Sequence, residues 1–229
     1  MRERIEGTVE LGCSLGVVGA FGEGFLEGFR AKYPGVALNV REASDMQVDR
    51  DLALGKCGLE LVVSPYQRGV DVRELYCCPV CLWMRADDPL AAKALVEAED
   101  LAYRRLAMPG PDFKCHDRLM RLADERGVEL GPIEQMHDPC RLYDFARSGR
   151  GMSFTVHHLR QNPVFSLDPD VISVPVDSMS WSFGIARRAG HTLTPAERAF
   201  WDWCVAWSAT LPCDPCCNKR LMGTCTRVP

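Results

Sequence analysis

GTVELGCSLGVVGAFGEGFLEGFRAKYPGVALNV, residues 7–40, contains the first strand–helix–strand unit of this chain. Thr8–Cys13 alternates apolar and polar side chains, as a half-buried strand does. Leu15–Tyr33 places its large apolar residues at helical spacing and ends at a Tyr-Pro-Gly stop signal. Val36–Val40 is then the second strand. The stretch predicts a β-α-β unit.

The next residues repeat the unit. Asp45–Gly55 is predicted to be a helix, with Ser44 or Asp45 as N-cap and Gly55 just past its end. The apolar run Leu59–Val63 is predicted to be a buried strand. A β-α-β-α-β order predicts a parallel sheet with right-handed crossovers.

A second alternating block follows a long apolar strand, Leu75–Arg85. Its predicted elements are strands at Arg105–Met108, Ile133–His137 and Met152–Thr155, helices at Asp112–Arg126 and Cys140–Ser148, and a short helical piece at His157–Gln161. Val171–Val174 and Trp181–Arg187 are expected to be strands. Thr194-Pro-Ala-Glu197 has the form of a capping box that starts a helix continuing through Phe200–Leu211.

Two α/β blocks in tandem predict a two-lobed protein. Residues 1–84 and 187–212 are expected to form lobe I, residues 85–186 lobe II, and residues 213–229 a cysteine-containing tail. The strands at 75–85 and 181–187 carry the chain from one lobe to the other and back. Such a double crossover makes a hinge, and we expect the ligand site in the cleft between the lobes.

Composition narrows the classes of function. Of the 229 residues, 47% are hydrophobic and 25% are charged, which is ordinary for a globular protein. The net charge of −4 argues against direct DNA binding, which usually needs a basic surface. No secretory signal or membrane-spanning run is visible, so we expect a cytoplasmic protein.

Several short motifs together resemble the effector-binding domain of LysR-type transcriptional regulators. They run in the family's order, although Glu60 only stands close to the family's usual aspartate and Asp88 replaces its usual histidine. They are Gly7-Thr-Val-Glu-Leu-Gly-Cys-Ser14, Phe29-Arg-Ala-Lys-Tyr-Pro-Gly-Val36, Leu54-Gly-Lys-Cys-Gly-Leu-Glu-Leu61, Asp88-Pro-Leu-Ala91, Glu99-Asp-Leu101 and Phe145-Ala-Arg-Ser-Gly-Arg-Gly-Met152.

This resemblance implies a periplasmic-binding-protein-like fold of the second type, with two mixed or parallel sheets joined by two crossover strands. It implies an effector sensor that reaches DNA only through an N-terminal winged helix-turn-helix, which these residues lack. It also implies a homodimer, in which the first helix pairs with the Cys140–Ser148 helix of another subunit. The glycines at 16, 19 and 22 are spaced to allow a close approach there.

In lobe I the predicted ligand contacts are Ser14, Leu15 and Gly16, together with Ser64 and Pro65. Ser14 lies between a strand end and a helix start, where a hydroxyl and free backbone N–H groups can face an anion or a carbonyl group. The alternative for Ser14 is a plain helix N-cap. Ser64 and Pro65 end the third strand and form a second edge of the same cleft.

In lobe II the predicted contacts follow strand ends in the same way. Lys114 can pair with a ligand carboxylate or can simply be solvated. His137 can face the cleft or can be a hydrogen-bonded structural residue, and either of the alternating residues Ser153 and Thr155 can contact the ligand. The full set is Gly110, Pro111, Asp112, Phe113, Lys114, His137, Ser153 and Thr155. We therefore expect a small anionic or aromatic effector.

Two other classes of function compete with the sensor. Gly12-Cys-Ser-Leu-Gly16 fits the nucleophile elbow of α/β-hydrolases, but too few residues precede it for the strands and oxyanion loop of that fold. A free-standing solute-binding protein for a transporter would need an export signal. The glycines of the first helix do not form a dinucleotide fingerprint, and no cofactor is predicted.

Twelve cysteines are present, and we expect most to be reduced thiols. Cys77, Cys78 and Cys81 fall in a strand predicted to be buried, which favours packing. The tail residues Cys213, Cys216, Cys217 and Cys225 are enough for a tetrahedral metal or an iron–sulfur site. Only one C-x-x-C pair is present, so an unordered tail without metal is the favoured interpretation.

Overall fold

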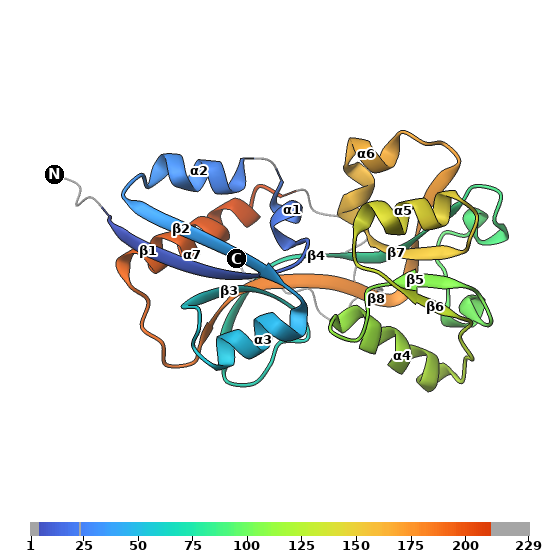
Figure 1. Ribbon diagram of the computed structural model, residues 1–229, viewed down its shortest axis with the longest axis horizontal. Helices are drawn as coiled ribbons and strands as arrows, with labels where there is room; N and C mark the ends of the chain where they lie inside the picture. The colour runs from blue at the N-terminus through green and yellow to red at the C-terminus, as the bar shows by residue number, and fades with distance from the viewer. Residues whose placement is uncertain (1–4, 23, 212–229) are drawn as a thin grey trace. The chain divides into compact units, whose positions relative to one another are not determined.

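The computed structural model describes residues 5–22 and 24–211, which form two compact units. Unit 1 takes the described residues up to Tyr76 and from Ser182 onward, and unit 2 runs from Cys77 to Trp181. Two long strands, β4 (Val70–Arg85) and β8 (Val171–Arg188), contain both boundaries (Figure 1).

Hydrogen bonding gives the strand order β2-β1-β3-β8-β4-β7-β5-β6. Because β4 and β8 are neighbours and each extends into both units, every unit has a sheet that includes a part of these two strands. The predicted α/β fold with two crossover strands is confirmed. The order is nevertheless continuous, because the crossover strands pair with each other and do not merely connect two separate sheets.

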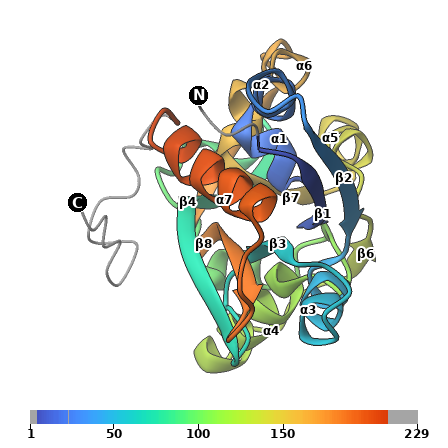
Figure 2. The same cartoon turned by 90° about the vertical axis from the view of Figure 1, so that its left-hand side faces the viewer.

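The sheet of unit 1 begins with the predicted β-α-β-α-β order. β1 (Gly7–Ser14) pairs in parallel with β2 (Val36–Ala43) and β3 (Leu59–Val63), and β3 pairs antiparallel with β8. Helix α3 (Asp45–Ala53) packs on one face through Val48 and Leu52. Helix α7 (Pro195–Ser208) lies against β1 on the other face, beside α2 (Figure 2).

Aromatic rings join α7 to the N-terminal helices of unit 1. Phe21 and Phe25 stack with ring centroids 4.0 Å apart. Trp203 Nε1 donates to the Phe25 carbonyl at 3.1 Å, and Trp207 Nε1 donates to the Phe21 carbonyl at 2.9 Å. Gly28 allows this packing, because a Cβ there would lie 3.0 Å from the Trp203 ring.

The prediction of one helix over Leu15–Tyr33 was wrong. The chain forms two helices, α1 (Val17–Phe21) and α2 (Phe25–Lys32). Gly22 and Gly24 both have positive φ, 81° and 86°, which ends one helix and precedes the next. The spacing of the apolar residues is helical throughout this stretch, but the backbone conformation at the two glycines divides it into two helices.

Unit 2 has a second α/β arrangement. β5 (Leu106–Met108) pairs in parallel with β6 (Ile133–Gln135) and β7 (Met152–Val156), and β7 pairs antiparallel with β4. The helices are α4 (Lys114–Arg126), α5 (Pro139–Arg147) and α6 (Pro163–Ser166), with 3₁₀ turns η1 (Pro89–Ala92), η2 (Ala98–Leu101) and η3 (His157–Gln161).

The sheet of unit 2 is covered on both faces. Leu119 of α4 packs with alternate residues of β4 and β7, such as Leu82 and Phe154. Trp83, which points to the other face, packs with Phe145 of α5 and Phe165 of α6. The sequence did not predict α6, which Asn162 caps by accepting a hydrogen bond from the Val164 N–H.

Other boundaries also differ from the predictions. Val171–Val174 and Trp181–Arg187 belong to one continuous strand, and β4 begins at Val70. Helix α4 begins at Lys114, with Phe113 as N-cap, so Asp112 remains outside the helix. The predicted capping box is confirmed: the Glu197 N–H donates to Thr194 Oγ1 at 3.2 Å, and the Thr194 N–H donates to Glu197 Oε2 at 2.8 Å.

Candidate functional site

Ser14 is the last residue of β1 and is buried, with 1% of its surface exposed. Its Oγ has no hydrogen-bond partner in the part of the chain that the structure describes. Leu15 follows with 38% exposure, and Gly16 has a φ of 86° at the start of α1. Because an unpaired buried hydroxyl costs about 1–3 kcal/mol, its presence at a strand end needs an explanation.

Ser64 and Pro65 lie at the end of β3 in the same unit. The Ser182 hydroxyl donates to Ser64 Oγ at 2.7 Å, and the Ser64 N–H donates to the Ser182 carbonyl at 2.9 Å. Pro65 is exposed. The hydroxyl of Ser64 is therefore already engaged, in contrast to that of Ser14.

The predicted residues Gly110 to Lys114 connect β5 to α4 in unit 2. Pro111 and Asp112 are exposed, whereas Lys114 is buried with 6% exposure. Phe113 stacks on His137, with ring centroids 5.8 Å apart and the planes 22° from parallel. The structure thus brings together two predicted residues that are 24 positions apart in the sequence (137 − 113).

Ser153 and Thr155 both point from β7 toward the side of the sheet that carries Trp83. Ser153 Oγ donates to the Leu142 carbonyl of α5 at 2.7 Å, so it ties a helix to the sheet. Thr155 is 7% exposed, and its Oγ1 has no partner among the described residues. Of the two, Thr155 has the hydroxyl that remains available.

Sequence reasoning missed His158, three residues after Thr155. Its ring stacks on Trp181, with centroids 5.3 Å apart, and its Nδ1 is buried without a partner among the described residues. The pKa of His158 is lowered to about 4, chiefly by burial and to a lesser extent by the neighbouring His157, so the ring is neutral at pH 7. Nothing in the local sequence distinguishes this histidine from its neighbour.

A buried acid lies on β3 beside β1. Glu60 is fully buried, and neither carboxylate oxygen has a hydrogen-bond partner in the described part of the chain. Its pKa is raised to about 8, chiefly because burial disfavours the charged form. The carboxylates of Asp51 and Asp49 add to the rise, while Arg41 and the Cys57 thiol oppose it.

Asp51, by contrast, is buried and fully paired. Its carboxylate accepts hydrogen bonds from Arg41, from Gln47 at 2.8 Å and from Lys56 at 2.9 Å. These partners hold the pKa of Asp51 at about 2. Arg41 is thus held by Asp51, which leaves Glu60 without a counter-charge of its own.

The geometry gives no support to the hydrolase alternative. Ser14 does lie between a strand and a helix, as the Gly-x-Ser-x-Gly motif requires. A serine nucleophile is activated by a base within hydrogen-bond reach, and Ser14 Oγ has no such bond among the described residues. Catalysis therefore has no positive evidence here.

The cysteines divide into described and undescribed groups. Cys77, Cys78 and Cys81 are buried cysteines of β4, and burial raises the pKa of Cys78 well above its ordinary value. The described residues contain no group of three His, Cys, Asp or Glu side chains that could hold a metal. Cys213, Cys216, Cys217 and Cys225 lie outside the described residues, so the tail prediction is untested.

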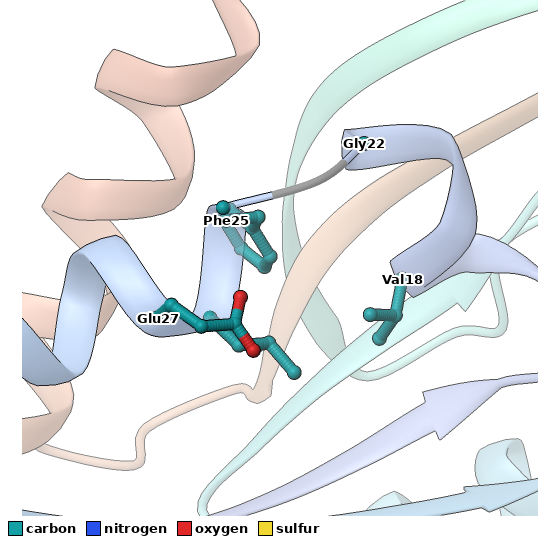
Figure 3. A pocket seen from close by; sticks show the side chains of 6 residues that line it. Val18, Gly22, Phe25 and Glu27 are labelled. Carbon is teal, nitrogen blue, oxygen red and sulfur yellow. The ribbon is translucent and has the colours of Figure 1, made fainter.

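One surface hollow lies in unit 1 between α1 and α2 (Figure 3). Val18, Phe25 and Leu26 give it apolar walls, and Glu27 places a carboxylate beside it. Gly22 and Gly24 open it because they have no side chains. None of the predicted contact residues lines this hollow, and we do not assign it to the ligand.

Comparison with known proteins identifies the family. A family model described as the LysR substrate binding domain matches residues 2–209. Comparison with curated protein sequences gives no match. Among the helices of the described ranges, none is long and apolar enough to cross a membrane.

Solved structures share the fold at low identity. The regulatory domain of CcmR from Synechocystis PCC6803, in complex with 2-PG, has a TM-score of 0.80 at 17% identity and covers 91% of this chain and 100% of its own. A putative LysR family regulator from Pseudomonas aeruginosa has a TM-score of 0.73 at 20% identity, covering 91% of this chain and 74% of its own.

The effector binding domain of QuiR, in complex with shikimate, has a TM-score of 0.74 at 13% identity and covers 90% of this chain and 98% of its own. The family match does not favour the alternative of a solute-binding protein for a transporter. Because the family model spans almost every described residue and the fold agrees, this chain belongs to the LysR substrate-binding domains, the regulatory domains of LysR-type transcriptional regulators.

Proposed function

We propose that the Ser14 hydroxyl of unit 1 and the Thr155 hydroxyl of unit 2 are each a contact for a small-molecule effector. One observation carries the proposal: each hydroxyl is at least nine-tenths buried near a strand end, and neither has a partner among the described residues. A ligand that hydrogen-bonds to either hydroxyl would remove the cost of leaving that hydroxyl unpaired. The expected cleft between the lobes stays a prediction.

The ligands of two structural neighbours support a small effector. The CcmR regulatory domain is in complex with 2-PG and the QuiR domain with shikimate. We expect an anionic or aromatic compound here as well, because Lys114 and the stacked rings of Phe113 and His137 are near the start of α4. Leu15, Gly16, Ser64, Pro65, Gly110, Pro111 and Asp112 stay predicted contacts. Of the pair Ser153 and Thr155 we choose Thr155, because the Ser153 hydroxyl is already bonded to the Leu142 carbonyl.

The effector would act by shifting a conformational equilibrium. A ligand can shift it only by its difference in affinity between the two states, typically about 1–3 kcal/mol. We assign the DNA contact to a winged helix-turn-helix outside these residues. Because such a regulator must reach DNA, we also assign the protein to the cytoplasm. The net charge of −4 supports this separation of roles.

We further propose a homodimer. A Cβ on Gly16, Gly19 or Gly22 would meet no atom within 4 Å, so the surface at α1 is open to a second copy. Helix α5, the proposed partner element, has an exposed face that includes Arg141 and Asp144. Size-exclusion chromatography with light scattering tests this proposal, and a monomer at micromolar concentration would refute it.

A thermal-shift screen tests the effector proposal. The chain is mixed with a panel of small carboxylates and aromatic acids, and the melting temperature of each mixture is compared with that of the chain alone. We expect at least one compound to stabilise the wild type. Ser14→Ala and Thr155→Val should melt at or above the wild-type temperature without ligand, because each removes an unpaired buried hydroxyl, but should respond less to the compound.

Ser153→Ala is the matched control on the same strand. It removes the hydrogen bond to Leu142, so its melting temperature should fall while its response to the compound stays unchanged. If no compound stabilises the wild type, or if Ser14→Ala and Thr155→Val respond as fully as the wild type, the proposed contacts are wrong.

A further inference from the structure

Arg118 is a half-buried arginine of α4 that has no counter-charge among the described residues. Its Nη1 donates to the Ser180 carbonyl at 2.9 Å, which fixes the side chain against β8. Burial lowers the pKa of Arg118, and the nearby Cys77 thiol only partly opposes the change. A guanidinium group has five N–H donors, so a single carbonyl leaves most of them unused.

The other half-buried arginines of the described chain are all paired with an acid. Their partners are Asp87 for Arg85 at 3.0 Å, Asp88 for Arg104, and Asp71 for Arg187 at 3.1 Å. Asp117, next to Arg118 in the sequence, pairs instead with Arg121 at 2.7 Å. Among the described half-buried arginines, Arg118 is therefore the one whose guanidinium group has no acidic partner.

The surroundings of Arg118 also favour an anion. Lys114 is one turn earlier on the same helix and is buried, so two cations share one face of the first half of α4. The positive end of the helix dipole lies at this same end. Cys77 lies on β4 and is the first residue of unit 2. Ser180 lies on β8, one residue before unit 2 ends.

We propose that Arg118 is the residue of unit 2 that binds an oxyanion of the effector, a carboxylate or a phosphate group. This inference rests on the proposed function and assigns the chemistry of the ligand. Arg118 can offer two parallel N–H donors to two oxygens of such a group, and the bond to Ser180 holds the guanidinium in place beforehand. In the sequence, the one sign of this site is that Arg118 follows Lys114 by four residues, which places the two cations on one face of a helix.

Titration with simple anions tests the assignment without knowledge of the effector. Arginine Nε–H resonances are followed in a nitrogen–proton correlation spectrum while sodium acetate or inorganic phosphate is added at constant chloride. Arg118→Lys, which keeps the charge, identifies the Arg118 resonance by its loss. Acetamide is the uncharged counterpart of acetate, and Arg121 on the same helix is the control residue.

We expect a saturable shift of the Arg118 resonance with acetate, with phosphate or with both, and none with acetamide. A response to acetate alone identifies a carboxylate site, and a response to phosphate alone identifies a phosphoryl site. If neither anion shifts Arg118 saturably, or if Arg121 shifts with the same midpoint, the inference is overturned.

The thermal-shift screen separates this inference from the proposed function. For a compound that stabilises the wild type, Arg118→Gln should weaken binding on the order of tenfold or more, and Arg121→Gln should not. A compound that binds both variants equally refutes the role of Arg118 and leaves the effector site at Ser14 and Thr155 intact. Anion binding at Arg118 without any stabilising compound would refute the effector proposal alone.

Discussion

The carboxylate of Glu60 fills the space that a side chain at position 12 would need. A Cβ on Gly12 would lie 2.7 Å from Glu60 Oε1 and 2.9 Å from both Cδ and Cγ. The two residues are opposite each other in the parallel pairing of β1 with β3, and β1 ends two residues later at Ser14. The position of a buried acid is thus linked to the strand that carries the proposed effector contact.

Gly12→Ala should destabilise the protein by about 1–3 kcal/mol, because the added methyl group overlaps several atoms of a fully buried side chain. The measurement is the free energy of unfolding from urea denaturation. In a double-mutant cycle, Gly12→Ala should cost much less in a Glu60→Ala background. Gly19→Ala is the matched control in α1, where a Cβ meets nothing within 4 Å of this chain, and at concentrations where the chain is monomeric it should be neutral or slightly stabilising.

If Gly12→Ala lowered the free energy of unfolding equally in the wild type and in the Glu60→Ala background, the strain would lie elsewhere in β1.

The pKa of Glu60 predicts how stability depends on pH. The carboxyl group has a pKa of about 8 in the folded chain, against an ordinary value of 4.5 for glutamate, so the folded state holds the proton more tightly between these values. Stability should therefore fall as pH rises from 4.5 to 8, by on the order of 3 kcal/mol, and this contribution should be constant outside that window. Urea unfolding at several pH values measures it.

Glu60→Gln should flatten this pH dependence and should be more stable than the wild type above pH 8. Glu10→Gln, at an exposed position of the neighbouring strand β1, should leave the pH dependence unchanged. A wild-type stability that stays level between pH 4.5 and 8, or an unaltered slope in Glu60→Gln, contradicts the assignment.

His158 should contribute the opposite slope at lower pH. Its pKa of about 4 in the folded chain lies below the ordinary histidine value of 6.5, so the folded state binds fewer protons between these values. Stability should fall as pH drops from 6.5 to 4, and His158→Phe, which keeps a ring against Trp181, should remove that part of the loss. The proton resonances of the His158 ring give the pKa directly, and a midpoint near 6.5 would rule out the burial argument.

Much of the fold follows from local patterns. The first β-α-β-α-β order, the capping box at Thr194 and Glu197, and the family resemblance all rest on residues that interact with near neighbours in the sequence. The break between α1 and α2 was missed, because Gly22 and Gly24 interrupt a run whose apolar spacing is helical throughout. The single strand β8 was read as two, since Pro175 looks like an interruption.

The candidate site was predicted less fully. Ser14 was predicted from its position at a strand end, and Thr155 from its alternation with Ser153 on one face of a strand. Only coordinates distinguish the unpaired hydroxyl of Thr155 from the engaged hydroxyl of Ser153. The proposal for Arg118 depends on its having no acidic partner among the described residues, and a sequence alone does not show which charged side chains pair. The stacking of His158 on Trp181 joins the 3₁₀ turn η3 to β8 and could not be predicted from local sequence.

The most direct test of the effector account is the dissociation constant of the most stabilising compound from the screen, measured by isothermal titration calorimetry for the wild type, Thr155→Val and Ser153→Ala. The account predicts that Thr155→Val raises the dissociation constant by roughly three- to tenfold, the loss of one hydrogen bond, while Ser153→Ala binds like the wild type. Equal dissociation constants for the wild type and Thr155→Val would contradict it.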